Sequence, residues 1–300
     1  MDKNKQTLYV MIGLPASGKS LYSREVSDNA TIVSSDKVRE KIFGDENIQG
    51  GAVDIFKVVH DKILEAIFRG EDVVFDATNI SYKHRRQLLQ KVRKYKVRTV
   101  GVLVATPIDE VKENNLSRDR KVPEYVIDRM LKSFYVPFWG EGWDDIEIIW
   151  NNQRRLEQNL VSKIQSLMDF DQESPHHEHS LGEHLSKVAD ALQGDDLSLI
   201  GLLHDIGKEF TKTFRNTKGE VGKVAHYYGH ENASAYLALF YLRALGCSNE
   251  YIINAVTRIQ FHMRPYNAKT EKSKRKLIGL VGKGVYEDLL KINRADSDAH

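Results

Sequence analysis

The segment at residues 13–20 constrains the fold of this chain more than any other part of the sequence. It reads GLPASGKS and matches G-x-x-x-x-G-K-[ST], between an apolar run at residues 8–12 and a helical pattern that starts near Lys19. In such a loop the backbone N–H groups face nucleotide phosphates, the lysine reaches the outer phosphates and the hydroxyl residue ligates Mg²⁺. The pattern predicts a site for ATP, or another nucleoside triphosphate, with Mg²⁺ on Ser20. The residues expected to form it are Gly13, Ser17, Gly18, Lys19 and Ser20.

Short apolar runs alternate with helical patterns through the first half of the chain. Strands are expected at residues 8–12, 31–33, 73–75, 97–105 and 146–150. Helical patterns lie between them, at residues 52–68 and from about residues 19, 81, 108 and 123. This alternation predicts a parallel sheet covered by helices, the α/β class.

The second half carries helical patterns without comparable strands. Helices are expected at residues 181–192, 197–205, 231–245, 251–262 and 286–296, with a bridging helix at 154–168. The chain is therefore expected to hold an α/β domain at residues 1–152, a bridging helix or linker at 153–174 and an all-α domain at 175–300.

Composition excludes several classes of protein. The single cysteine, Cys247, allows no internal disulfide, so we expect a reducing, cytoplasmic location. No apolar run approaches the ~20 residues that a membrane helix needs, and residues 1–7 are polar, so no membrane partner or signal peptide is expected. The 44 basic and 42 acidic residues nearly cancel, so any preference for nucleic acid has to come from local patterns.

An aspartate and an arginine follow the second expected strand in the segment SSDKVR. A kinase that acts on a hydroxyl needs a carboxylate to accept the hydroxyl proton, and Asp36 is the candidate for this general base. Arg39 lies one helical turn further on, where it can hold a phosphate of the acceptor. The alternative is that Asp36 caps the helix and Arg39 is merely exposed.

Two further segments of the first half suggest roles around the nucleotide. Asp76 ends the third expected strand and is a candidate to hold Mg²⁺ through water; alternatively, the segment from Asp76 to Asn79 caps the next helix. Arg118 and Arg120 stand in a polar loop before a helix, where a lid would bring positive charge to the transferring phosphate.

These motifs together resemble the 5′-hydroxyl polynucleotide kinase family over roughly residues 8–135. The similarity includes GLPASGKS, SSDKVR, VVFDATNIS followed by Arg85 and Arg86, and the arginine loop ending in VPEYVIDRM. The resemblance implies transfer of the ATP γ-phosphate to a 5′-OH end of RNA or DNA. It also implies that Asp36 is the base, that Arg39 holds the acceptor phosphate and that Arg118 or Arg120 contacts the γ-phosphate.

A basic stretch agrees with a nucleic-acid acceptor. Residues 81–98 contain eight Lys or Arg and no acidic residue, a composition that phosphate backbones favour. Arg85 and Arg86 lie in this stretch and are candidate nucleic-acid contacts. A solvated helix face would have the same composition, so both interpretations stay open.

Histidine is the unusual residue of the second half, which holds nine of the chain's 11 histidines after residue 175. Six histidine and aspartate positions are too widely spaced for one local zinc motif, but they suit ligands that project from several helices into one cavity. Imidazole and carboxylate together are ligands for catalytic Mn, Fe, Co, Ni or Zn. The candidate ligands are His184, His204, Asp205, His230, His262 and Asp296.

The order H…HD…H…H…D, with LLHDIGK and a closing RAD, resembles the HD-domain phosphohydrolase superfamily over about residues 175–300. The resemblance implies that His184, His204, Asp205 and Asp296 bind a first metal ion and that His230 and His262 complete a second site. It also implies that Lys208 binds phosphate.

The two resemblances together are similar to bifunctional end-healing enzymes of nucleic-acid repair. Broken RNA often carries 5′-OH and 2′,3′-cyclic phosphate or phosphate ends, and a separate ligase needs the opposite arrangement. Two other hypotheses stay open. One is a metabolite or nucleoside kinase joined to an HD nucleotide phosphohydrolase, and the other is a nucleotide-sensing regulatory or toxin-like module.

Overall fold

The computed structural model describes residues 6–26, 29–44, 54–151, 159–175 and 178–299. The chain forms two compact units. The first consists of residues 1–123 and 141–153, and the second of residues 124–140 and 154–300. Within the described ranges, no helix is long and apolar enough to cross a membrane.

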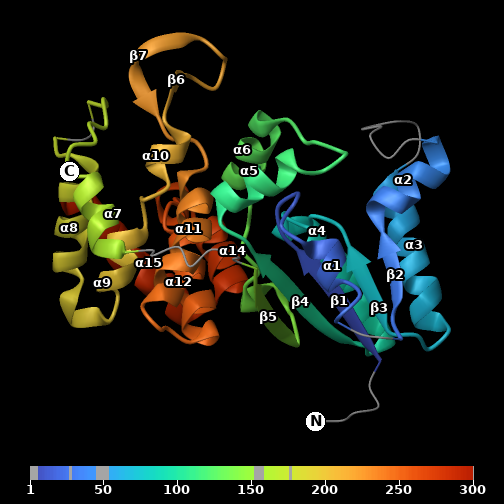
Figure 1. Cartoon of the computed structure of the whole chain (residues 1–300). Helices are drawn as coiled ribbons and strands as arrows, with labels where there is room; N and C mark the ends of the chain where they lie inside the picture. The colour runs from blue at the N-terminus through green and yellow to red at the C-terminus, as the bar shows by residue number, and fades with distance from the viewer. Residues whose placement is uncertain (1–5, 27–28, 45–53, 152–158, 176–177, 300) are drawn as a thin grey trace. The chain divides into compact units, whose positions relative to one another are not determined.

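Five parallel strands form the sheet of the first unit (Figure 1). Their order in space is β2-β3-β1-β4-β5. The most buried of them, β4, reads RTVGVLVA, as expected of a strand covered on both faces by helices. The predicted parallel α/β sheet is confirmed. The strands are β1 (Thr7–Ile12), β2 (Thr31–Ser34), β3 (Val73–Asp76), β4 (Arg98–Ala105) and β5 (Asp145–Trp150).

Helices connect these strands, and the apolar side chains between helices and sheet form the core. Met11, Val74, Val100, Val102 and Val104 are fully buried in one cluster of that core. The helices are α1 (Lys19–Tyr22), α2 (Ser35–Phe43), α3 (Ile55–Phe68), α4 (Tyr82–Val92) and α5 (Ile108–Leu116), with a short 3₁₀ turn η1 (Arg93–Tyr95).

The carboxyl ends of β1 and β3 bring the phosphate loop and Asp76 to one edge of the sheet. The two strands are direct neighbours, with Val10 paired to Phe75. The loops that follow them are joined by hydrogen bonds: Gly13 N donates to the Thr78 carbonyl oxygen at 3.0 Å. β3 lies between β2 and β1, so α2 starts one strand further from the phosphate loop.

The second unit is mostly helical, as predicted. It also contains an antiparallel hairpin, β6–β7, which the sequence does not indicate because its strands are short and largely exposed. Its elements are α6 (Glu124–Lys132), α7 (Leu160–Ser166), α8 (Leu181–Ala191), η3 (Gln193–Asp195), α9 (Ser198–Leu203), α10 (Lys208–Thr211), β6 (Thr213–Arg215), β7 (Val221–His226), α11 (His230–Ala244), α12 (Asn249–Phe261), α13 (Arg264–Asn267), α14 (Glu271–Val281) and α15 (Lys283–Asp298). A 3₁₀ turn, η2 (Trp139–Glu141), leads back into the first unit.

Helix α6 belongs to the second unit, although the sequence places residues 124–140 in the first domain. The reason is its apolar face: Ile127 and Leu131 are buried, and Asn232 Nδ2 on α11 donates to the Lys132 carbonyl oxygen at 3.0 Å. The predicted bounds 1–152, 153–174 and 175–300 otherwise stay a prediction. Of the expected bridging helix, residues 160–166 are helical as α7, and residues 152–158 lie outside the described ranges.

A buried ion pair fixes α4 to the return segment before β5. Arg85 Nη2 lies 2.5 Å from Glu141 Oε1, Arg85 Nε donates to Glu141 Oε2 at 2.8 Å, and both side chains are fully buried. Arg85 Nη1 also donates to the Asn79 carbonyl oxygen at 2.7 Å, next to the loop that contacts the phosphate loop. The ion pair therefore helps to hold the loop at residues 78–79, which in turn contacts the phosphate loop.

Replacing Glu141 by glutamine is expected to destabilise the first unit by about 3–5 kcal/mol, because the guanidinium of Arg85 stays buried without its counter-charge. Urea unfolding followed by tryptophan fluorescence measures the change, because two of the three tryptophans, Trp143 and Trp150, lie in the first unit. The exposed Lys83→Met variant is the matched control on α4, with an expected change within about 0.5 kcal/mol. A loss below about 1 kcal/mol in Glu141→Gln would contradict the structural role.

Candidate functional sites: a phosphate loop and a buried histidine–aspartate cluster

The phosphate loop is held in shape by its neighbours. Thr106 Oγ1 and Asn151 Nδ2 each donate to the Ser17 carbonyl oxygen at 2.9 Å. Gly18 has a φ of 91°, and a Cβ atom there would lie 2.7 Å from Asn151 Nδ2. A Cβ atom on Gly13 would lie 2.6 Å from Ser17 Oγ. A side chain at either position would displace Ser17 or Asn151, and the positive φ of Gly18 also disfavours any other residue there.

Lys19 is buried behind this loop, and its Nζ donates to the Leu14 carbonyl oxygen at 2.6 Å. Burial lowers the pKa of Lys19 to about 8; the carboxylates of Asp76 and Asp36 oppose this shift, and the charge of Arg118 adds to it. The charged groups of Asp76, Asp36 and Arg118 therefore all lie close enough to Lys19 to affect its ammonium group. A triphosphate entering beside Lys19 would favour the charged ammonium that burial disfavours.

Asp36 lies between two of the predicted arginines. Arg39 Nη1 is 2.5 Å from one carboxylate oxygen, and Arg120 Nη1 is 3.3 Å from the other. The structure thus brings together the predicted general base, the predicted acceptor-phosphate arginine and one predicted lid arginine. Arg118 is exposed, and Ser20 is exposed at the start of α1.

Neither capping alternative agrees with the structure. Helix α2 is capped by Ser34, whose side chain accepts a hydrogen bond from the Lys37 backbone N–H, so Asp36 is not the cap. Asn79 is not a cap either, because its Nδ2 donates to the Met11 carbonyl oxygen at 2.8 Å and α4 begins after Ser81.

The prediction that Arg85 contacts nucleic acid is wrong. Its guanidinium is fully buried against Glu141, so no polynucleotide phosphate can reach it. Arg86 is half-buried on α4 and stays a candidate contact. The other basic side chains of the stretch that face solvent are Lys83, Lys91, Arg93, Lys94 and Lys96.

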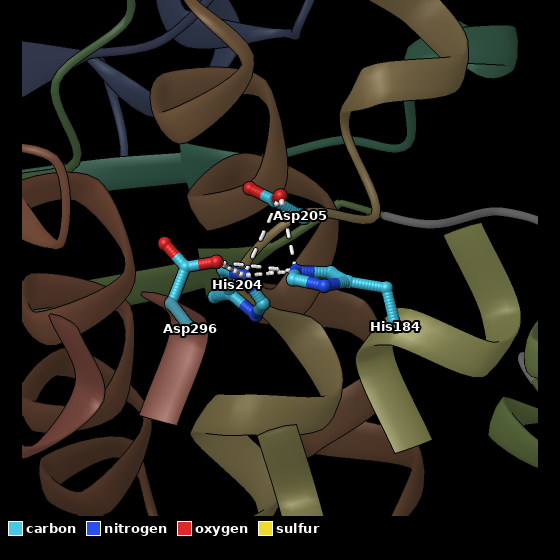
Figure 2. A group of neighbouring side chains, drawn as sticks. All are labelled: His184, His204, Asp205 and Asp296. Carbon is cyan, nitrogen blue, oxygen red and sulfur yellow. Dashed lines mark hydrogen bonds and ion pairs between the residues drawn. The ribbon is translucent and has the colours of Figure 1, made fainter. Parts of the chain in front are cut away.

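Four side chains of the second unit converge in its interior (Figure 2). His184 Nε2 lies 3.2 Å from Asp296 Oδ1 and 3.4 Å from His204 Nε2, and His204 Nε2 lies 3.4 Å from Asp205 Oδ2. All four are buried, and each offers one ligand atom within 4.8 Å of the others. Helices α8 and α15 and the turn after α9 supply them, so the predicted first ligand group meets at one point.

A second group shares Asp205 with the first. The other carboxylate oxygen, Oδ1, lies 3.1 Å from His230 Nε2 and 3.4 Å from His262 Nε2. These three side chains also offer ligand atoms within 4.8 Å of one another. The predicted second ligand group is therefore assembled beside the first.

The histidine rings are oriented by backbone carbonyl groups. In His204, His230 and His262 the Nδ1 atom lies 2.7 Å from the carbonyl oxygen of the residue three positions earlier. Because a carbonyl oxygen only accepts, Nδ1 is the donor, and Nε2 faces the cluster. This is the arrangement that proteins use to present a histidine to a metal ion.

The electrostatics of the cluster favour a cation. Burial lowers the pKa of His204, but the carboxylates of Asp205 and Asp296 outweigh it and raise this pKa to about 10. Burial would raise the pKa of Asp205, yet the charges of His204, Lys208 and His230 hold it well below its usual range. A proton and a metal ion therefore compete for the same Nε2 atoms.

The residues fit a transition metal. Among the described residues, Asp205 Oδ1 and His262 Nε2 are buried without a hydrogen-bond partner. An unsatisfied buried polar atom costs roughly 1–3 kcal/mol, and coordination of an ion would satisfy both. The imidazole and carboxylate donor set suits Mn²⁺, Fe²⁺, Co²⁺, Ni²⁺ or Zn²⁺.

The cluster contacts one predicted residue, Lys208, and two residues that the sequence pattern does not indicate, Gln172 and Tyr266. Lys208, the predicted phosphate ligand, lies 2.7 Å from Asp205 Oδ2 and donates to Gln172 Oε1 at 2.8 Å. Tyr266 donates to Asp296 Oδ2 at 2.9 Å, which leaves Oδ1 facing the histidines. Gln172 and Tyr266 lie outside the HD motif and contact it only through the fold, so the sequence carried no signal for them.

Comparison with known proteins bears on the first unit. Residues 8–137 match a family described as AAA domain. The L-seryl-tRNA(Sec) kinase of Methanococcus maripaludis is 24% identical over 163 residues, which are 51% of this chain and 62% of that protein. This chain therefore spans less than two thirds of the length of that relative.

Solved structures with a similar region include a chain of the Pnkp1/Rnl/Hen1 RNA repair complex, with 20% identity and a TM-score of 0.40 over 43% of this chain and 44% of that one. A fungal RNA kinase has 14% identity and a TM-score of 0.37 over 54% of this chain and 43% of that one.

The parallel sheet, the phosphate loop and the match to the AAA domain family over residues 8–137 identify the first unit as a P-loop domain. The second unit is a helical region with a buried histidine–aspartate cluster that fits a metal ion. Its assignment to the HD superfamily stays a prediction.

We expect the protein to retain one or two transition-metal ions per chain after incubation with Mn²⁺ and dialysis, as measured by elemental analysis. Asp205→Asn should lose both ions, because Asp205 faces both ligand groups. Tyr266→Phe should lower metal affinity about 10-fold, because it frees a ligand carboxylate from its support.

The matched control is His179→Ala, whose ring lies outside both ligand groups and contacts Lys187. Its metal content should equal that of the wild type. Equal metal content in Asp205→Asn, in a protein of unchanged circular dichroism, would show that the ions bind elsewhere.

Proposed function

We propose that the first unit transfers the γ-phosphate of ATP to the 5′-OH end of a polynucleotide. Asp36 accepts the hydroxyl proton while the 5′ oxygen attacks the γ-phosphorus, and ADP leaves as the bond between the β–γ bridging oxygen and the γ-phosphorus breaks. Lys19 holds the outer phosphates, and Ser20 and Asp76 hold Mg²⁺, directly or through water. Gly13, Ser17 and Gly18 shape the loop around the phosphates.

The observation that carries the kinase proposal is the position of Asp36 between Arg39 and Arg120 near Lys19. The carboxylate that would accept the hydroxyl proton thus has beside it two guanidinium groups that can bind phosphate oxygens. When an acceptor enters, Arg39 has a phosphate to bind in place of Asp36, and Arg120 or Arg118 can turn to the γ-phosphate. The exposed basic side chains of residues 83–96, together with Arg86, support a polyanionic acceptor.

We further propose that the second unit is an HD phosphohydrolase that removes a 2′,3′-cyclic or 2′(3′) phosphate. His184, His204, Asp205 and Asp296 would hold one metal ion, and Asp205, His230 and His262 a second. A metal ion bound there supplies Lewis acidity toward the phosphoester. Lys208, which is buried beside Asp205, would neutralise a phosphate oxygen.

Both activities in one chain would prepare broken ends for a separate ligase, with RNA or DNA as the substrate. A second candidate acceptor is the hydroxyl of a seryl-tRNA, because the chain is similar to an archaeal L-seryl-tRNA(Sec) kinase. Comparing oligonucleotides, free nucleosides and seryl-tRNA as acceptors separates these two candidates from a nucleoside kinase.

The first test is label transfer from γ-labelled ATP to a 5′-OH oligonucleotide. Asp36→Asn should lower kcat about 10²–10⁴-fold with little change in the KM for ATP, because it removes the general base and leaves the phosphate loop intact. Lys19→Met should abolish transfer. His204→Ala is the control and should keep kinase activity; no transfer by the wild type, or normal transfer by Asp36→Asn, would refute the kinase proposal.

The second test uses an RNA oligonucleotide with a 2′,3′-cyclic phosphate end, with and without Mn²⁺. The wild type should open the ring and release phosphate only with metal, and Asp205→Asn should lose this activity while keeping label transfer. Lys19→Met is the reciprocal control. If the wild type binds no metal and His204→Ala changes no activity, the second unit is a regulatory module instead.

A further inference from the structure

The hairpin β6–β7 has no part in the chemistry proposed above, yet both of its ends are tied to the cluster. It joins α10, which begins with Lys208, to α11, which begins with His230. Lys208 lies 2.7 Å from Asp205 Oδ2, and His230 lies 3.1 Å from Asp205 Oδ1. Figure 1 shows the hairpin extending beyond the neighbouring helices of its unit. The hairpin therefore starts and ends beside the candidate metal site.

The base of the hairpin is anchored firmly. Tyr227 donates its hydroxyl hydrogen to the Gln172 carbonyl oxygen at 2.6 Å, and Ala225 N donates to the Glu173 carbonyl oxygen at 2.9 Å. The Lys208 ammonium lies over the Tyr227 ring, 5.4 Å from its centroid. These contacts fix the direction in which the hairpin leaves the site.

The outer part of the hairpin carries positive charge and exposed apolar side chains. Residues 212–226 contain four Lys or Arg and one acidic residue, Glu220. Phe214 is 37% exposed, Val221 68% and Val224 40%. A two-stranded hairpin is marginally stable by itself, and exposed apolar side chains on it do not add to a core. Cationic side chains beside an exposed aromatic ring are the combination that binds single-stranded nucleic acid, through phosphates and stacked bases.

We propose that the β6–β7 hairpin binds the single-stranded polynucleotide immediately upstream of the phosphorylated end that the cluster holds. The proposal rests on the proposed function of the second unit. Arg215, Lys218 and Lys223 contact backbone phosphates, and Phe214 stacks on a base. Extended chain rises about 3.3 Å per residue, so the four steps from Lys212 to Asn216, where the turn begins, span roughly 13 Å.

Binding of a fluorescein-labelled, 3′-phosphorylated RNA 12-mer, followed by anisotropy across a salt series, tests the proposal directly. The triple variant Arg215→Glu, Lys218→Glu, Lys223→Glu should raise Kd at least 10-fold at low salt. It should also lower the slope of log K against log salt by about 2, since each phosphate contact on a single strand contributes about 0.7. Phe214→Ala should raise Kd several-fold without changing the slope.

The matched control reverses three exposed charges of α11 and α15: Arg243→Glu, Lys283→Glu, Lys291→Glu. It changes net charge equally and should bind like the wild type. If the hairpin triple variant and Phe214→Ala, both folded by circular dichroism, bind with wild-type Kd and slope, the proposal is overturned and the surface serves another partner. If the triple variant is unfolded, Lys218→Glu and Phe214→Ala decide the question by the same criteria.

Hydrolysis separates this proposal from the proposed function. In the hairpin triple variant, the ratio of kcat/KM for a 12-mer with a 2′,3′-cyclic end to kcat/KM for a 2′,3′-cyclic mononucleotide should fall at least 10-fold. If the wild type hydrolyses neither substrate, the hydrolase proposal fails, and the binding measurement still decides whether the hairpin holds the strand.

Discussion

The carboxylate of Asp205 is the contact on which the helical unit depends. One oxygen faces His204 and Lys208, and the other faces His230 and His262. These partners come from segments far apart in the chain, so one buried negative charge draws together α10, α11 and α12 and the turn after α9. Such a charge is unfavourable in an apolar interior unless cations surround it. The atoms that hold these segments together are therefore also the atoms that could coordinate a metal ion.

The candidate sites of the two units suit ligands of opposite charge. The first provides glycines, backbone amides and a buried lysine, which suit a polyanion. The second provides carboxylates and imidazole lone pairs, which suit a cation. Burial disfavours the charge of Lys19 and lowers its pKa, whereas the carboxylates of the second unit favour a positive charge on His204 and raise its pKa. A triphosphate would stabilise the charge of Lys19, and a metal ion could replace the proton on His204.

Local sequence patterns predicted the parts of the sites that depend on local structure. The phosphate loop and the strands around it are recognisable because glycine spacing and apolar runs directly reflect backbone requirements. The six cluster positions are recognisable because they occur in a motif. Gln172 and Tyr266 are not, since they reach the cluster only through the fold. Arg85 was misleading because it stands in a basic run, while its partner Glu141 lies far along the chain and is visible only in three dimensions.

The chain passes from the first unit to the second at helix α6 and then returns to the first unit. The arginine loop at residues 118–120 belongs to the first unit, the helix that follows it packs in the second, and the chain then returns to supply β5 of the sheet. No single cut can therefore release the first unit intact. A fragment ending near residue 152 would include α6 without the second unit. Ile127 and Leu131 would then be exposed to solvent, and such a fragment would tend to aggregate. Each unit is therefore built from two separate stretches of the chain, so a shortened version of either unit has to keep both of its stretches.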